Sequence, residues 1–143
     1  MTREELQGIA EQYVKAWERR DPTAIAQFHA SDCVAESPIY ATLRGRKAIE
    51  EASRAFFTSF PDAALTIDAL LVDGSRIGIF TTINATHVNE FFGMPGTNKR
   101  IEFRNARLME TDETGLITHE RRIYDFTGLL VQIGILRAKP AKP

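Results

Sequence analysis

The chain has 143 residues, which suits one domain, and 18 basic against 19 acidic side chains give a formal net charge of −1. A near-neutral chain has no overall attraction for nucleic acid or an anionic membrane, so we expect neither as a partner. One cysteine, Cys33, leaves no internal disulfide, and no apolar stretch approaches the ~20 residues of a membrane helix. The charged start around Arg3 has no secretory pattern, so we expect a cytoplasmic protein.

Helical patterns come first. Thr2 with Glu5 three residues later is typical of a capping box, and apolar residues follow at helical spacing over 6–17. Asp21-Pro22 predicts a new helix start, with Asp as the N-cap and Pro in the first turn. A short second helix through Phe28 is expected.

Residues 33–44 indicate an irregular extended segment broken at Ser37-Pro38. Gly45 leads into a third helix, whose apolar face carries Ile49, Ala52, Phe56 and Phe60. Pro61 ends it, because the residue before a proline avoids helical geometry.

The rest of the chain favours strands. The expected strands are 65–71, 77–87, 101–110 and 116–125, with hairpin signals at Asp73-Gly74 and at 112–115. Residues 88–99 form an apolar connection, and Leu129, Leu130 and Ile133 predict a closing helix. Helices followed by strands indicate one α+β domain over 1–143, with a tail at 136–143. We expect a cone: a curved antiparallel sheet packed on the N-terminal helices, enclosing a pocket.

The last expected strand carries the candidate chemistry. Simple alternation places Ile117, His119, Arg121, Ile123 and Asp125 on one side, which we expect to line the cone. Burial would raise the pKa of Asp125 and the neighbouring Arg121 would lower it; a raised value suits acid–base catalysis. The alternative is that Asp125 only caps the following helix, and Arg121 only pairs on a solvated face.

His87 ends a strand before the aromatic connection and is a further catalytic candidate, although a lone histidine is more often structural. The three histidines and one cysteine show no ligand spacing, so no metal site is expected. Phe91, Phe92 and Met94 predict either a lid or a subunit contact. The expected pocket-lining residues are Tyr13, Trp17, Phe28, Tyr40, Phe56, Phe60, Phe92, Phe103, His119 and Ile123.

A series of short motifs supports a family resemblance. In chain order they are Thr86-His87, Phe92-Gly93-Met94-Pro95, Gly115-Leu116-Ile117, Arg121-Arg122-Ile123-Tyr124-Asp125 and Leu129-Leu130-Val131-Gln132-Ile133-Gly134. Together they resemble the SnoaL-like polyketide cyclase (ester cyclase) branch of the nuclear transport factor 2-like superfamily, which includes the ketosteroid isomerases. The motif from Asp125 to Gly134 is the most specific, and the resemblance covers nearly the whole chain.

The resemblance implies a cone fold, a homodimer built through the sheet, and a pocket without metal or organic cofactor. It implies that Asp125 acts as acid and base, as its counterpart does in the aldol closure of polyketide cyclases. Two departures stand out: Arg121 occupies a position where many relatives have Trp, and the sequence offers no clear match for a second catalytic residue of the cyclases. A pocket Arg beside an acid is instead reminiscent of the limonene epoxide hydrolases. Glu36 and Glu102 are the candidates for a second carboxylate.

Three hypotheses follow. The first is a cofactor-free cyclase, isomerase or hydrolase that acts on a polyketide-, steroid- or terpenoid-like molecule, with Asp125 transferring a proton and Arg121 or His87 stabilising negative charge. The second is a non-catalytic protein that binds a small apolar molecule in the same pocket. The third is a structural dimer module whose cone is filled by Trp17 and phenylalanines; a cavity too small for a ligand would favour it.

Overall fold

The computed structural model describes residues 1–137, so most of the tail predicted at 136–143 lies outside the described residues. Three helices precede most of the sheet: α1 (Arg3–Glu18), α2 (Pro22–Gln27) and α3 (Arg46–Ser59). The predicted capping box is present, because Thr2 and Glu5 bond each other's backbone N–H. Asp21 caps α2 through a bond from the Ala24 N–H at 3.1 Å.

Six strands form one sheet in the order β2-β1-β6-β5-β4-β3. They are β1 (His29–Ser37), β2 (Ala41–Arg44), β3 (Ala64–Asp73), β4 (Arg76–Thr86), β5 (Arg100–Thr111) and β6 (Ile117–Tyr124). All neighbours are antiparallel except β1 and β6, which run parallel. The prediction that 33–44 is irregular is therefore wrong: the segment forms most of β1 and all of β2, with the break at Pro38 serving as the turn between them.

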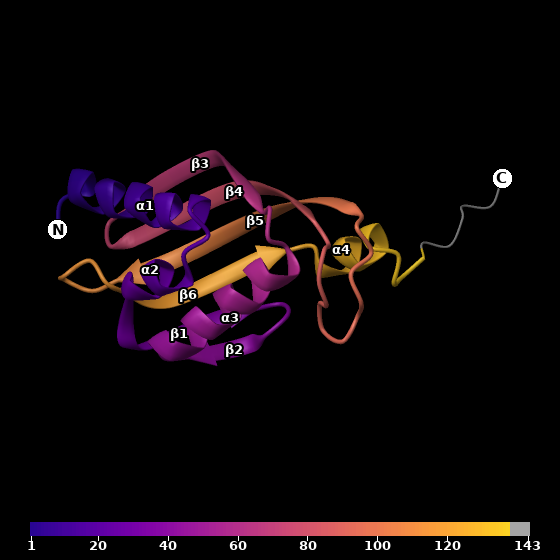
Figure 1. Ribbon diagram of the computed structural model, residues 1–143. Coiled ribbons are helices and arrows are strands. Elements are labelled where there is room, and N and C mark those ends of the chain that lie inside the picture. The colour runs from indigo at the N-terminus through magenta and orange to yellow at the C-terminus, as the bar shows by residue number, and fades with distance from the viewer. Residues whose placement is uncertain (138–143) are drawn as a thin grey trace.

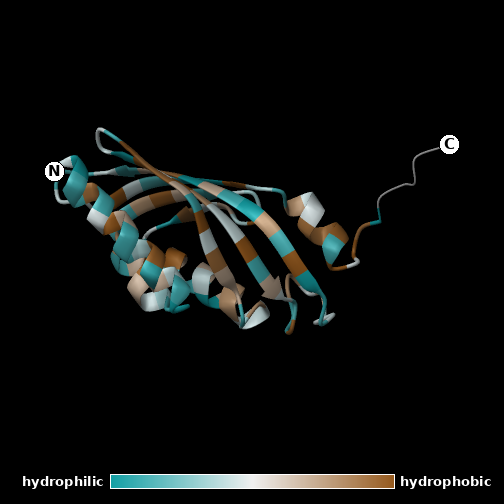
Figure 2. Ribbon diagram, turned by 90° about the horizontal axis from the view of Figure 1, so that it is seen from above, coloured by the Kyte–Doolittle hydropathy of each residue, from teal (hydrophilic) through white to brown (hydrophobic). Residues whose placement is uncertain are grey.

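The sheet is curved and unclosed, and α1, α2 and α3 lie together against its concave side (Figures 1 and 2). Alternate residues of β4 and β5 are buried, as the period of a half-covered strand requires. The core between helices and sheet contains Trp17, Ile25, Ile49, Ile79 and Ile101, among others. The predicted α+β cone is confirmed, whereas a single domain over all of 1–143 stays a prediction.

A fourth helix, α4 (Phe126–Gln132), lies beyond the end of β6 (Figure 1). β6 pairs with β5 only from Asn105 onward, so the preceding residues of β5 lack that neighbour. The Gln132 side chain completes the ladder there: its Oε1 accepts from the Glu102 N–H at 2.7 Å and its Nε2 donates to the Glu102 carbonyl at 2.8 Å. Gln132, which belongs to the motif from Leu129 to Gly134, therefore has a structural role at the open end of the cone.

The connection between β4 and β5 is folded back on the core. Phe91 is buried against Phe60 and His87, and its backbone exchanges two hydrogen bonds with Met94. Phe92 instead is exposed and lies 5.5 Å, ring to ring, from Tyr40 in the β1–β2 turn. The segment therefore contributes one residue to the core and one to the surface beside Tyr40.

Candidate functional site

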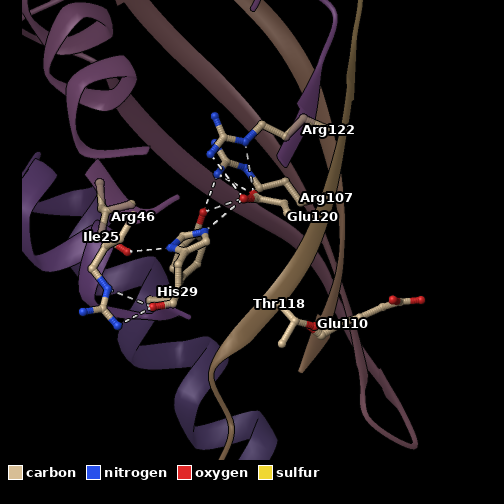
Figure 3. Close-up of polar contacts among 9 residues, drawn as sticks. Ile25, His29, Arg46, Arg107, Glu110, Thr118, Glu120 and Arg122 are labelled. Carbon is tan, nitrogen blue, oxygen red and sulfur yellow. Dashed lines mark hydrogen bonds and ion pairs between the residues drawn. The ribbon is translucent and has the colours of Figure 1, made fainter. Parts of the chain in front are cut away.

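A cluster of charged side chains lies inside the cone, between the sheet and the helices (Figure 3). Glu120 on β6 is fully buried, and Arg122 lies two residues further along the same strand. Arg107 faces Arg122 across the β5–β6 ladder. Arg122 donates to both Glu120 oxygens, at 3.1 and 3.2 Å, and Arg107 donates to Oε1 at 3.1 Å. Two guanidinium groups thus share one carboxylate.

Two helix-side residues complete this cluster. His29, where β1 begins, places Nε2 3.1 Å from Glu120 Oε2 and Nδ1 3.1 Å from the Ile25 carbonyl. Both ring nitrogens of His29 therefore lie beside an acceptor oxygen. The Tyr13 hydroxyl accepts from Arg107 and points its own proton toward Glu120. The buried centre therefore carries at least two positive charges against one negative.

These positions on β6 depend on a β-bulge. The β5–β6 register passes from Glu110 opposite His119 directly to Thr111 opposite Ile117, which leaves Thr118 without a partner. An extra residue reverses the alternation beyond it, so Ile117 and Glu120 both face inward. The expectation that His119, Arg121 and Ile123 line the cone is therefore wrong.

The electrostatics keep Glu120 ionised. Burial alone would raise its pKa, but Arg122, the His29 hydrogen bond and Arg107 outweigh burial and hold the pKa well below its usual range. Burial likewise opposes the charge of Arg122, yet Glu120 keeps the pKa of that guanidinium raised. Burial raises the pKa of Tyr13, with Arg107 acting in the opposite direction. Glu120 is consequently a weak base that serves to hold the cations in place.

A cavity of about 40 Å³ lies beside this cluster. Its apolar lining is formed by Trp17, Ile39, Ala52, Phe56, Ile83, Phe103 and Leu129, and its polar lining by Tyr40, Ser53, Asn105, Arg107, Arg122 and Tyr124. Three buried polar atoms in this lining have no hydrogen-bond partner: Trp17 Nε1, Ser53 Oγ and Asn105 Oδ1. Such atoms are rare in folded proteins and indicate a missing partner, which is water or a ligand.

An open groove of about 550 Å³ adjoins the cavity, and Tyr40 lines both. The groove is also lined by Arg54, Thr58, Phe91 and Phe92. Burial raises the pKa of the Tyr40 hydroxyl, so it stays neutral. Tyr40 thus lies where the cavity meets the larger groove, with Phe92 beside it on the groove side.

The three predicted catalytic residues do not come together. Asp125 is exposed: its Oδ1 accepts from the Gly128 N–H at 2.8 Å as the cap of α4, and it lines an open groove with Arg104 and Ile123. Arg121 has a 58% exposed side chain and lies 3.4 Å from Glu36. Both therefore lie away from the cone interior, and their catalytic roles stay predictions.

His87 is the third of these residues, and it is buried elsewhere in the core. Its Nδ1 lies 3.0 Å from the Thr97 hydroxyl, its Nε2 has no partner, and its ring packs on Phe60. Burial lowers the pKa of His87 and favours the neutral ring. It lines neither the cavity nor the groove, so its catalytic role also stays a prediction.

The structure sorts the predicted pocket residues into three groups. Trp17, Tyr40, Phe56 and Phe103 line the cavity, and Phe92 lines the groove outside it. Tyr13 belongs to the charge cluster, with Phe28 packed edge-on against it, and Phe60 lies in the core. His119 and Ile123 lie on the outer face of the sheet.

Sequence reasoning missed Ser53, Asn105, Arg107, Glu120 and Arg122 as site residues. A signal existed for two of them: Asn105 and Arg107 continue the alternation of Ile101 and Phe103, so their side chains must face inward. For Glu120 and Arg122 no such signal exists, because the bulge at Thr118 is not visible in the residue pattern.

Residues 1–137 hold no group of three or more His, Cys, Asp or Glu side chains arranged to bind a metal ion. Among the same residues no helix has the length and apolar character to span a membrane.

The comparisons with known proteins agree with this fold. The family model for SnoaL-like polyketide cyclases matches residues 7–133, so the chain belongs to that family. No curated protein matches the chain. The expected resemblance to this branch of the nuclear transport factor 2-like superfamily is thereby confirmed.

Several solved structures superimpose over nearly the whole chain. AclR, a candidate hydroxylase from Streptomyces galilaeus, has a TM-score of 0.84 at 22% identity, covering 97% of this chain and 91% of its own. TsrD from Streptomyces laurentii has a TM-score of 0.82 at 23% identity, covering 95% and 99%. A candidate SnoaL-like polyketide cyclase from Jannaschia sp. CCS1 has a TM-score of 0.78 at 12% identity, covering 92% and 93%. At these identities the likeness concerns the fold.

Proposed function

We propose that the protein is a cofactor-free enzyme that converts a small conjugated molecule, of polyketide, steroid or terpenoid type, at the cavity inside the cone. The observation that carries this proposal is that three residues lining one cavity beside two buried arginines have buried polar atoms without a partner: Trp17 Nε1, Ser53 Oγ and Asn105 Oδ1. A purely structural core satisfies its buried polar groups internally. Membership of a cyclase family supports a small-molecule substrate.

The arginines suit the stabilisation of negative charge on a substrate oxygen. Arg107 and Arg122 line the cavity, are fixed by Glu120, and lie where little water lowers their field. Arg107 also lies 4.3 Å from the Trp17 ring centroid, which fixes it further. The charge-stabilising role first expected for Arg121 passes in this proposal to Arg122, because only Arg122 faces the interior.

The volume of the cavity is relevant to the third hypothesis, that the protein is a structural dimer module. About 40 Å³ holds a functional group or a water molecule, whereas pockets for drug-sized ligands measure roughly 300–1,000 Å³. The adjoining groove of about 550 Å³ supplies the missing room. We therefore place the reacting oxygen in the cavity and the body of the substrate in the groove, with Tyr40 moving aside between them.

Proton transfer by Asp125 stays part of the proposal only as a prediction. Its carboxylate caps α4 and lies on the outer face. It therefore reaches the cavity only if the end of β6 and the helix α4 change their conformation. Residues inside the cone offer no free carboxylate for the task, since Glu120 is the one buried acid among residues 1–137.

The test is turnover with a matched pair of variants. A panel of polyketide-, steroid- and terpenoid-like compounds is incubated with the protein and products are sought by mass spectrometry. We expect Arg122→Lys to reduce turnover of the compound found by about 10²-fold or more, as for loss of a pre-placed donor. Arg121→Lys, on the adjacent but exposed position, should leave turnover unchanged.

The opposite result, with Arg121→Lys inactive and Arg122→Lys active, would overturn the site. Tight binding of a compound with no product would favour the non-catalytic binding protein. Failure of every compound to bind, even to a Tyr40→Ala variant that opens the cavity, would favour the structural module.

A further inference from the structure

The cavity beside Arg107 and Arg122 has a chemical preference that can be derived from its charges. Both guanidinium groups are buried, and their one anionic partner among the described residues is Glu120, which His29 also contacts. Burying a charge without a partner costs several kcal/mol, so an excess of buried positive charge favours a compensating anion.

The arginines have hydrogen-bonding capacity left for such an anion. Arg122 uses Nε and Nη2 for Glu120, and Arg107 uses Nη1 for Glu120 and Tyr13. An arginine offers five N–H donors, so both residues keep donors beyond these contacts. Trp17 and Ser53, which also line this cavity, add two donors without a partner, Nε1 and Oγ.

Water explains part of this arrangement but not all of it. One water in a cavity of about 40 Å³ has room to accept from the Trp17 or Ser53 group and to donate to Asn105 Oδ1. Water does not cancel net charge, whereas an anionic oxygen accepts the same hydrogen bonds and neutralises the excess. The apolar lining of the cavity, including Phe56 and Phe103, continues into a groove lined by Phe91 and Phe92, and this suits an anionic group carried on a flat ring system rather than a strongly hydrated ion.

We propose that the cavity recognises an anionic oxygen, a carboxylate or a ring enolate, on a planar conjugated molecule, and holds it between Arg122 and the Trp17 and Ser53 donors. This inference rests on the proposed function, because it names the substrate class of the same site. The ring system extends past Tyr40 into the groove lined by Phe91 and Phe92. A neutral molecule of the same shape lacks the charge that the two arginines require.

The experiment compares 2-naphthoate with 2-naphthamide, which have nearly the same shape and differ in charge. Binding is measured by calorimetry and by the fluorescence of Trp17, the one tryptophan of the chain, which lines the cavity. We expect the acid to bind at least 10-fold more tightly than the amide. Formate is the third ligand; it should bind much more weakly than naphthoate if the ring contributes.

Variants of two cavity residues test which side chains cause the preference for the acid over the amide. Ser53→Ala removes one donor from a buried position and should weaken naphthoate binding several-fold and naphthamide binding less, because a hydrogen bond to a charged acceptor is the stronger one. Arg122→Met should abolish the preference for the acid; Arg121→Met, on the exposed face of the same strand, should retain it. Ser53→Ala keeps the test usable if Arg122→Met does not fold, because it leaves the charge cluster intact.

The outcomes separate this inference from the function beneath it. Equal binding of acid and amide, or tighter binding of the amide, would overturn the anion preference while the cavity remained a binding site. Formate binding as tightly as naphthoate would overturn the assignment of a ring-bearing ligand. If neither naphthalene compound binds even to Tyr40→Ala, both the inference and the proposed pocket are wrong.

Discussion

The two faces of the sheet both carry arginine–glutamate pairs, but these are buried on the inner face and exposed on the outer face. Two neighbouring residues of β6 show the difference. Arg122 faces inward, is buried, and donates two bonds to Glu120. Arg121 faces outward, is 58% exposed, and approaches Glu36 at 3.4 Å. Coulomb attraction is screened at the surface and strong in the interior, so the same kind of ion pair differs severalfold in its effect.

The outer face also exposes apolar side chains that the inner face would bury. Phe80, Leu108 and Ile123, on three adjacent strands, are 45%, 45% and 62% exposed. The inner face thus has more buried positive than negative charge, and the outer face has exposed apolar surface. For the inside we propose a ligand; for the outside, a second copy of the chain.

The largest expected effect contrasts the two carboxylates of these ion pairs. Glu120→Gln should lower the free energy of unfolding by roughly 3–5 kcal/mol, because Arg107 and Arg122 would be left buried without an anion. Glu36→Gln, which removes the exposed partner of Arg121, should change it by about 0–1 kcal/mol. Urea unfolding measures both, and equal losses would contradict the contrast between the two faces.

The pH dependence of stability tests the role of the buried carboxylate, Glu120, separately. The folded pKa of Glu120 lies below its unfolded value of about 4.3, so its stabilisation is complete above that pH and is lost as pH falls toward the folded pKa. Wild type should therefore lose stability below about pH 4 more steeply than Glu120→Gln, by up to ~1.4 kcal/mol per pH unit. Parallel curves for the two proteins would show that Glu120 does not titrate as described.

The sequence was sufficient for the features that depend on local pattern. The capping box at Thr2, the Asp21 cap and the hairpin at Asp73-Gly74 depend on short-range chemistry, and each is present. The helices-then-sheet order and the family motifs led to the cone. β1 was missed because its residues are mixed in polarity and it pairs with β6, some 85 residues away.

The site was harder to predict because it depends on one irregularity. The bulge at Thr118 reverses the alternation of β6, and without it Arg121 rather than Arg122 would face the cone. Arg107 could have been found from the alternation of β5, whose buried run includes Ile101 and Phe103. An arginine is not expected to be buried among apolar residues, and only its buried ion-pair partner Glu120 explains its position.

A third prediction tests the outer face, where the homodimer implied by the family resemblance is still a proposal. The face combines apolar residues with both charge signs, Asp68 and Arg104, which is compatible with a self-complementary interface between two copies. Ile123→Asp should weaken self-association by about 2 kcal/mol or more, seen as a shift from dimer to monomer in light scattering. Its effect on the stability of the monomer should stay near 0.5 kcal/mol, roughly the range for exposed sites.

The control for this variant is Val88→Asp, an exposed apolar residue in the connection after β4 rather than on the sheet. It should leave the dimer intact. A wild-type protein that is monomeric at tens of micromolar, or equal effects of the two substitutions, would contradict an interface on this face.

The smallest effect concerns Asp125, which lies on the outer face directly after β6. Its carboxylate caps α4 through the Gly128 N–H, and asparagine caps helices about as well as aspartate. Asp125→Asn should therefore change stability little, whereas Asp125→Ala should lower it by about 1 kcal/mol. Comparing turnover of these two variants separates capping from chemistry. Loss of turnover in Asp125→Asn at unchanged stability would place proton transfer at Asp125 and require α4 to move; retained turnover confines Asp125 to the cap and leaves the chemistry inside the cone.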